Sequence, residues 1–303
     1  MLKLYTKING KYQELSAVAI APHLKPIKKV KVQDAISQYI KNCTSNKCAK
    51  NQKSEKLHFE RLVKFTQDRN IEYIDELTCI IMQEYESFML KQMKVSSVNR
   101  RFNTFKHFFV KCKEWKFIYD NPCEGMRKRR EEDNPYKVWP ELVFKKFIKE
   151  TSGTYTHIFN FLWLTGSRPM ECKNLKWSDI NYDELEITLS CGKNAKVSRK
   201  FPITHDLSKL LHSIKMDSIY VFSVNKKQVS NDLLYQYCKT RLGYIGKEKY
   251  TVYGLRHTFG TRLSGQGGNA FEIAELMGHS KMETTRRYVH TNKNSLLKLL
   301  NKK

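Results

Sequence analysis

The chain has 303 residues, with 55 lysines and arginines against 30 aspartates and glutamates, so its formal net charge at pH 7 is +25. This length suffices for about two domains, and such an excess of positive charge predicts a polyanionic partner, with nucleic acid ahead of an anionic membrane surface. No run of about 18 apolar residues occurs and the first residues lack the apolar core of a signal peptide, which argues against a membrane-spanning or secreted chain and predicts a cytoplasmic protein.

The eight cysteines are scattered along the chain, and several of them fall in apolar helical patterns. This distribution predicts reduced thiols in a reducing compartment. Cys43 and Cys48 could contribute to a zinc site with His58, but no second pair of Cys or His follows at ligand spacing. We therefore expect no metal site.

Two short strand-like runs in residues 2–15 flank Asn9-Gly10, the strongest two-residue signal for a β-hairpin. A lone hairpin is marginal in water and needs a surface to pack on. We assign residues 1–26 to this N-terminal hairpin segment, which ends among prolines.

Helical periodicity dominates residues 27–123, which we assign to a first, helical domain. The predicted helices run from Val32 to Cys43, from Ser54 after a polar loop over 44–54, near 76–92 and near 96–118. The last of them interleaves basic residues with phenylalanines, so one face can pack in a core while the other contacts phosphates or is simply solvated. Its basic residues are Arg100, Arg101, Lys106, Lys111 and Lys113.

Asn121-Pro122 ends the helical region, and residues 124–137 are charged and have no apolar period. This composition predicts a basic linker to a second domain, residues 138–303. The cluster Arg127–Arg130 could run along DNA, or the linker could be merely solvated.

The second domain begins with helical patterns at 140–150 and 155–165, followed by T-G-S-R-P-M-E at 165–171. Gly166 is expected to end one helix and Ser167 to cap the next, with Arg168 in its first turn. The alternative is an ordinary i,i+3 ion pair between Arg168 and Glu171.

A β-hairpin is predicted next, with strands at Leu185–Leu189 and Lys200–Ile203 and a polar turn at Lys193–Lys196. Lysines on turns are common at protein surfaces, so the turn by itself indicates no chemistry.

An arginine and a histidine occupy predicted helix ends further along the chain. Leu255, Phe259 and Leu263 recur with helical spacing, and Arg256 is expected at the helix start, where backbone N–H groups favour an anion. A second helical pattern stops at Gly278, which suits a left-handed cap and leaves His279 on the turn.

A third short helix from about Met282 would carry Tyr288, nine residues after His279. In that position the tyrosine, the histidine and Arg256 could meet one phosphate. The alternative is a helical domain in which Arg256 pairs with a carboxylate, His279 caps a helix and Tyr288 is half-buried core.

These motifs resemble the signatures of the tyrosine recombinase (phage integrase) family. The similar segments are Y-G-L-R-H-T-F-G at 253–260, M-G-H-S at 277–280, R-R-Y-V-H at 286–290, T-G-S-R-P-M-E at 165–171 and G-K-N-A-K at 192–196. The chain departs from the family pattern at Tyr253, where the family usually has a histidine three residues before the arginine.

The resemblance implies a mainly α fold with a small β-sheet. In it a helical core-binding domain and a mixed α+β catalytic domain form a C-shaped clamp around DNA. The N-terminal segment would then be an arm-type extension, although it is short for that role, or a docked hairpin.

The resemblance also implies DNA cleavage and rejoining through a 3′-phosphotyrosyl bond at Tyr288, with neither metal, cofactor nor ATP. Arg168 and Arg256 would stabilise the transition state, His279 would donate a hydrogen bond to the phosphate, and Lys193 would protonate the leaving oxygen. Lys196 remains an alternative to Lys193 because the turn is one residue longer than usual. Tyr253 would donate a hydrogen bond to the phosphate.

The expected partners are double-stranded DNA and further copies of the chain, as a homotetramer on two DNA sites, with a monomeric state in solution left open. Two other functions fit the same residues. One is type IB topoisomerase-like cleavage with strand rotation, and the other is a catalytically weak DNA-binding regulator, which Tyr253 motivates.

Overall fold

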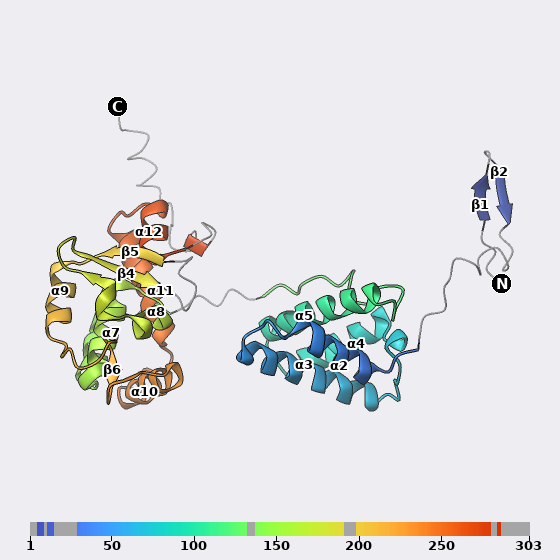
Figure 1. Cartoon of the computed structure of the whole chain (residues 1–303), viewed down its shortest axis with the longest axis horizontal. Helices are drawn as coiled ribbons and strands as arrows, with labels where there is room; N and C mark the ends of the chain where they lie inside the picture. Colours follow the sequence, from blue (N-terminus) through green and yellow to red (C-terminus); the bar gives the residue numbers. More distant parts are fainter. Residues whose placement is uncertain are drawn as a thin grey trace. The chain divides into compact units, whose positions relative to one another are not determined.

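The computed structural model describes residues 29–131, 137–190, 198–279 and 284–285, together with the backbone of 5–8 and 11–14. The chain divides into two compact units, Met1–Asp133 and Asn134–Lys303 (Figure 1). Each unit has its own buried apolar cluster. The described elements are mainly helices with small antiparallel sheets, which confirms the predicted fold class.

The N-terminal strands β1 (Tyr5–Ile8) and β2 (Lys11–Glu14) pair antiparallel, with Ile8 opposite Lys11. This register confirms the hairpin that Asn9-Gly10 predicts. The two turn residues themselves lie outside the described part of the chain.

Four α-helices build the core of the first unit. They are α2 (Val32–Cys43), α3 (Ala49–Gln67), α4 (Cys79–Leu90) and α5 (Val95–Glu114), with a short 3-10 turn, η2 (Ile74–Glu76), before α4. Phe59 on α3 packs against Tyr39 of α2 and Phe108 of α5, with ring centroids 5.4 and 5.1 Å apart. Edge-to-face aromatic pairs of this kind add to the stabilisation from burial alone.

The polar loop expected over 44–54 is wrong for its second half, because α3 begins at Ala49. Most side chains of 49–54 are exposed, and a helix turn that faces water needs no apolar residue. Ala, Lys and Gln have high intrinsic helix propensity, so these turns form without a periodic pattern.

Residues at the start of the predicted linker belong to the first unit. Met126 is buried in its core, and the Arg129 guanidinium pairs with Glu86 on α4 at 2.6 Å. The backbone N–H of Arg129 also donates to the Asn99 side chain at 2.9 Å. One apolar residue, one ion pair and hydrogen bonds to Asn99 anchor this charged segment, so its composition still resembles that of a free linker.

The second unit opens with α6 (Glu141–Lys149), α7 (Gly153–Thr165), α8 (Pro169–Asn174) and a 3-10 turn, η3 (Trp177–Asp179). A three-stranded antiparallel sheet follows in the order β3 (Ile180–Asn181), β4 (Glu186–Ser190) and β5 (Ser198–Pro202). Leu189 pairs with Arg199 in its register. The predicted hairpin is confirmed, whereas its turn lies among residues 191–197, which are not described.

The remaining elements complete the second unit. They are α9 (His205–His212), the strand pair β6 (Ser223–Val224) and β7 (Lys227–Gln228), α10 (Asn231–Tyr244), α11 (Val252–Gly265) and α12 (Ala270–Met277). No helix in the described ranges combines the length and the apolar character that a membrane span requires.

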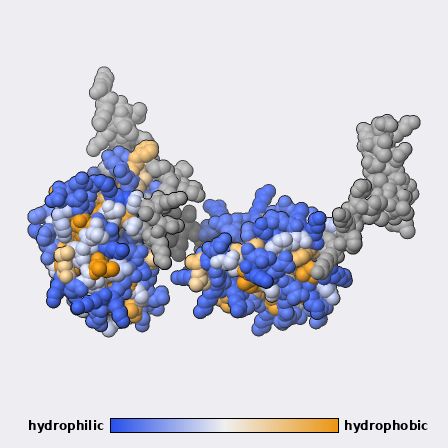
Figure 2. Space-filling model, viewed as in Figure 1, coloured by the Kyte–Doolittle hydropathy of each residue, from blue (hydrophilic) through white to orange (hydrophobic). Residues whose placement is uncertain are grey.

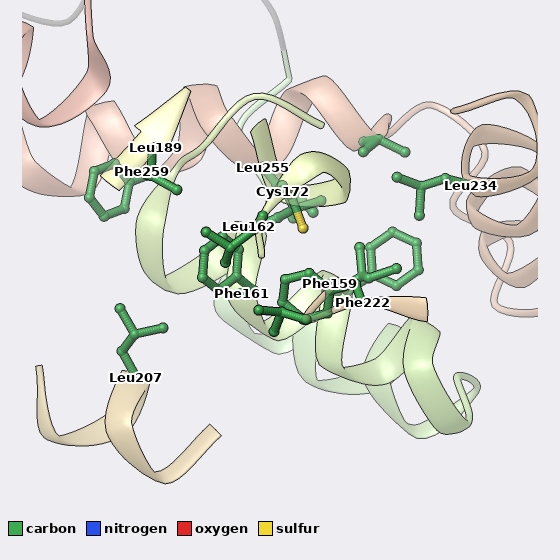
Figure 3. Close-up of a cluster of buried hydrophobic side chains, with 14 of the residues drawn as sticks. Phe159, Phe161, Leu162, Cys172, Leu189, Leu207, Phe222, Leu234, Leu255 and Phe259 are labelled. Atoms are coloured by element: carbon green, nitrogen blue, oxygen red, sulfur yellow. The ribbon is translucent and has the colours of Figure 1, made fainter. Parts of the chain in front are cut away.

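The core of the second unit joins α7 and α11. Figure 3 shows Phe161 and Leu162 of α7 near Leu255 and Phe259 of α11, with Cys172 of α8 beside them. Burial of each such side chain contributes roughly 1.5–3 kcal/mol. Apolar packing therefore fixes the positions of these helices, and polar residues at their ends build the site.

The face of each unit drawn in Figure 2 is mostly hydrophilic.

Candidate active site

Arg168 lies immediately before α8, as the N-cap residue of that helix. Its backbone N–H donates to the Glu171 carboxylate at 2.8 Å. The expectation that Ser167 caps the helix is therefore wrong. Ser167 lies one residue further out and is buried, whereas Arg168 holds the N-cap position and the Glu171 carboxylate accepts its backbone N–H.

Glu171 binds two guanidiniums with one carboxylate oxygen, Oε1. Arg168 Nη1 and Arg199 Nη1 both lie 2.7 Å from it, and the Glu171 side chain is only 2% exposed. Burial by itself would raise the pKa of Glu171, but the hydrogen bond and charge of Arg199, aided by Arg168, outweigh it and lower the pKa to about 2. The i,i+3 pair is thus real, and it is part of a three-residue network.

Arg256 is buried within α11, whose first residue is Val252 and whose N-cap is Thr251. The expectation that Arg256 occupies the helix start is wrong, since it lies one turn inside. Its Nη1 donates to the Gly166 carbonyl at 2.9 Å and its Nη2 to the Met277 carbonyl. Burial first, and then the charge of Arg168, lower the pKa of Arg256 to about 10.

Three arginines donate hydrogen bonds to carbonyls at the C-terminal end of α12. Leu276 accepts from Arg199 Nε at 2.9 Å, Met277 accepts from Arg256, and Gly278 accepts from Arg168 Nη2 at 2.8 Å. The final carbonyls of a helix lack intrahelical partners and form the negative end of its dipole, so they favour cations. The end of α12 therefore holds three guanidiniums from distant segments close together.

His279 follows this helix end directly. Gly278 adopts the left-handed conformation with φ 63° and ψ 51°, as its position predicts. The backbone N–H of His279 then closes the turn by donating to the Ala274 carbonyl at 2.9 Å. His279 Nδ1 lies 2.7 Å from the hydroxyl of the buried Thr285, a contact that orients the imidazole ring.

Tyr253 is the second residue of α11 and is half-buried. It occupies the N-terminal turn that was expected to hold Arg256. Its ring meets that of His257, one turn later, edge to face with centroids 5.2 Å apart.

The structure thus brings together Arg168, Arg256 and His279, with Tyr253 one turn before Arg256. Tyr288, Lys193 and Lys196 lie outside the described residues.

The sequence analysis did not single out Arg199. In the tyrosine recombinase family that this chain resembles, the segment with the catalytic lysine follows a pattern like G-K-x-x-K-x-R-x-x-P. Arg199 and Pro202 have the spacing of its last four positions. This match was the signal that could have identified the third arginine.

The model of the phage integrase family matches residues 143–295, half of the chain. The chain belongs to the phage integrase family. It is therefore a tyrosine recombinase, an enzyme that acts on DNA, and the matched range contains every candidate catalytic residue of the sequence analysis.

Known proteins resemble this recombinase over most of its length. Tyrosine recombinase XerC of Pediococcus pentosaceus is 25% identical over 234 residues, which cover 70% of this chain and 77% of XerC. The Tn1549 transposon integrase in complex with a circular intermediate DNA matches with TM-score 0.72 and 19% identity, over 89% of this chain and 98% of that one. A lambda integrase tetramer bound to a Holliday junction matches with TM-score 0.74 and 14% identity, over 94% and 92%. The two structures establish the shared fold.

Proposed function

We propose that this recombinase cuts and rejoins double-stranded DNA through a covalent 3′-phosphotyrosyl intermediate at Tyr288. The tyrosine hydroxyl loses its proton to solvent or to His279, and its oxygen attacks the scissile phosphorus. The bond from phosphorus to the 5′-oxygen breaks, and that oxygen leaves as a hydroxyl after accepting a proton from the general acid. Because the new ester retains the energy of the phosphodiester, a 5′-hydroxyl from another strand can reverse the step without ATP.

The observation that carries this proposal is the cluster of guanidiniums at the end of α12, next to His279. A phosphoryl transition state accumulates negative charge on its oxygens, and fixed donors stabilise it more than mobile solvent does. Arg256 carries more N–H donors than the Gly166 and Met277 carbonyls require. It can bind a phosphate oxygen while its backbone contacts persist.

We assign the other roles by position. Arg168 is half-buried beside the Gly278 carbonyl and would bind the phosphate together with Arg256. His279 would donate to a non-bridging oxygen, and Tyr253, in the first turn of α11, would donate from its hydroxyl. Lys193, or alternatively Lys196, would protonate the leaving 5′-oxygen.

The first unit, which corresponds to the expected core-binding domain, would bind the DNA backbone through α3 and α5. Arg61 and Arg100 are exposed and Arg101 is half-buried. Burial, together with the charges of Arg101 and Arg100, lowers the pKa of His58 to about 4. A concentration of positive charge on these helices suits phosphate binding.

Four copies of the chain on two DNA sites would carry out strand exchange in the cytoplasm. The two units of each copy would together clamp the duplex. The tetramer described for lambda integrase on a Holliday junction supports this assembly by analogy. Strand exchange rather than free rotation is also the activity that the name of the XerC relative indicates.

The test is a suicide substrate, a nicked DNA from which the cleaved end diffuses away so that covalent protein–DNA accumulates. The wild-type chain should form the adduct in the presence of a chelator. Tyr288→Phe should form none and keep its DNA affinity, since only the nucleophilic oxygen is lost. Tyr244→Phe, at an exposed tyrosine of α10, serves as control and should react normally. An adduct in Tyr288→Phe would assign the nucleophile to another tyrosine.

A further inference from the structure

Arg199 lies on β5, three residues after Lys196 in the sequence, and its side chain is only 10% exposed. It donates from Nη1 to Glu171 and from Nε to the Leu276 carbonyl. A Cβ atom added to Gly278 would lie 2.9 Å from both Cδ and Nη1 of Arg199. The turn before His279 therefore rests directly on this guanidinium.

We propose that Arg199 is a positioning residue for DNA cleavage, which holds Glu171 in place for Arg168 and holds the end of α12 in place for His279. The inference rests on the proposed function, because it assigns Arg199 to the same reaction. Arg199 would touch neither the phosphate nor the nucleophile and would act only through these two partners.

The shared oxygen explains the first effect. Arg168 Nη1 and Arg199 Nη1 bind the same Oε1 of Glu171, so Glu171 is held from both sides. Without Arg199 the carboxylate could turn toward Arg168 and draw that guanidinium away from the Gly278 carbonyl. A displacement of about 1 Å at a reacting group can cost roughly 10²-fold in rate.

The Leu276 carbonyl explains the second effect. It lies three residues before His279, and Arg199 Nε is its side-chain donor. Lysine in place of Arg199 would keep the charge, but a single ammonium cannot reproduce the planar fork that reaches Glu171 and Leu276 at fixed angles.

The alternative is that Arg199 only stabilises the fold, and the pH profile of cleavage distinguishes the two. In the described part of the chain, Arg168, Arg199 and Arg256 are the cations that interact with the Glu171 carboxylate, and the neighbouring Cys172 is buried. Burial raises the pKa of Glu171 and Arg199 is the strongest influence that lowers it. Loss of Arg199 should raise this pKa, so that Glu171 becomes protonated, and Arg168 loses its acceptor, at a higher pH.

The experiment measures single-turnover cleavage of the suicide substrate by the full chain, over a pH series on the acid side of neutral, with the melting temperature of each variant. Arg199→Gln should cleave roughly 10–100-fold more slowly at neutral pH, and its rate should fall with acid at a higher pH than that of the wild type. Arg199→Lys should be intermediate. Lys200→Gln removes a charge from the same strand, at an exposed residue paired with Glu186, and should match the wild type.

Wild-type rate and pH profile in Arg199→Gln would overturn the inference, and so would a slower rate with an unshifted profile and a lowered melting temperature. If Arg199→Gln does not fold, Arg199→Lys decides, since a wild-type rate there would show that charge alone suffices. A wild-type chain that forms no adduct would instead contradict the proposed function.

Discussion

At the scale of single residues, Tyr253 occupies the first turn of α11, where Arg256 was expected. Arg256 is instead buried one turn later. Backbone N–H groups in a first turn favour an anion. The residue that departs from the family pattern therefore occupies the place suited to meet a phosphate oxygen with its hydroxyl.

Tyr253→Phe should slow single-turnover cleavage by a modest factor, because one hydrogen bond to the phosphate is lost. Tyr253→His should remain active, since an imidazole can donate the same bond. The pH dependence of the wild-type cleavage rate should contain no transition typical of an imidazole that is lost in Tyr253→Phe. If Tyr253→Phe were as inactive as Tyr288→Phe, Tyr253 would have a larger role than hydrogen-bond donation.

Lys193 and Lys196 can be separated by the leaving group. A substrate with sulfur at the 5′-bridging position needs no proton from a general acid, because a thiolate leaves readily. This substrate should restore cleavage to Lys193→Ala but not to Arg256→Ala, which lacks a transition-state donor. Restoration of Lys196→Ala alone would move the general acid to Lys196.

At the scale of elements, α12 acts as the scaffold of the site although it is only eight residues long. Its C-terminal carbonyls bind Arg168, Arg199 and Arg256. At its other end, the Asn269 side chain accepts the N–H groups of Phe271 and Glu272, each at 2.9 Å. The N-terminal cap and the arginine contacts stabilise the same short helix from opposite ends.

Asn269→Ala should lower the free energy of unfolding by about 1 kcal/mol, as expected for the loss of an N-cap, and should also slow cleavage because the arginines lose a firm support. Ser230→Ala removes the cap of α10, where Ser230 accepts from Leu233 at 3.2 Å. It should cost about as much stability without slowing cleavage. Equal cleavage rates in the two variants, measured well below their melting temperatures, would contradict the scaffold role of α12.

At the scale of the whole molecule, each unit has its own buried core, and all described site residues belong to the second unit. On the proposed function, the chemistry of cleavage at one site depends on contacts within the second unit, whereas recombination by four copies would also need contacts between copies. Residues 294–303 carry leucines at 296, 297, 299 and 300. Because so short a segment cannot bury them by itself, they need a surface to pack on.

Deletion of 294–303 should spare adduct formation on a single site and impair recombination between two sites, if these leucines pack on a neighbouring copy. Lys298→Ala, which keeps all four leucines, is the control and should recombine normally. Full recombination by the truncated chain would exclude this role for the tail.

The sequence by itself determined most of the helices, both hairpins and the positions of Gly278 and His279. These features depend on local signals, namely apolar periodicity, turn residues and a glycine that can adopt a positive φ. Arg168 and Arg256 were also identified from sequence, since their motifs are specific. None of these inferences requires knowledge of which segments meet in space.

Only the tertiary structure decided how the arginines are held. Arg199 reaches Glu171 from 28 residues away and Leu276 from 77, and no local pattern records contacts across such separations. The packing of α11 on α7, with Phe259 against Gly166, brings Arg256 to the Gly166 carbonyl. Met126 and Arg129 likewise join the first unit through contacts with its helices. In each case long-range packing selects the partners of a polar group, because buried donors and acceptors must be satisfied wherever the fold places them.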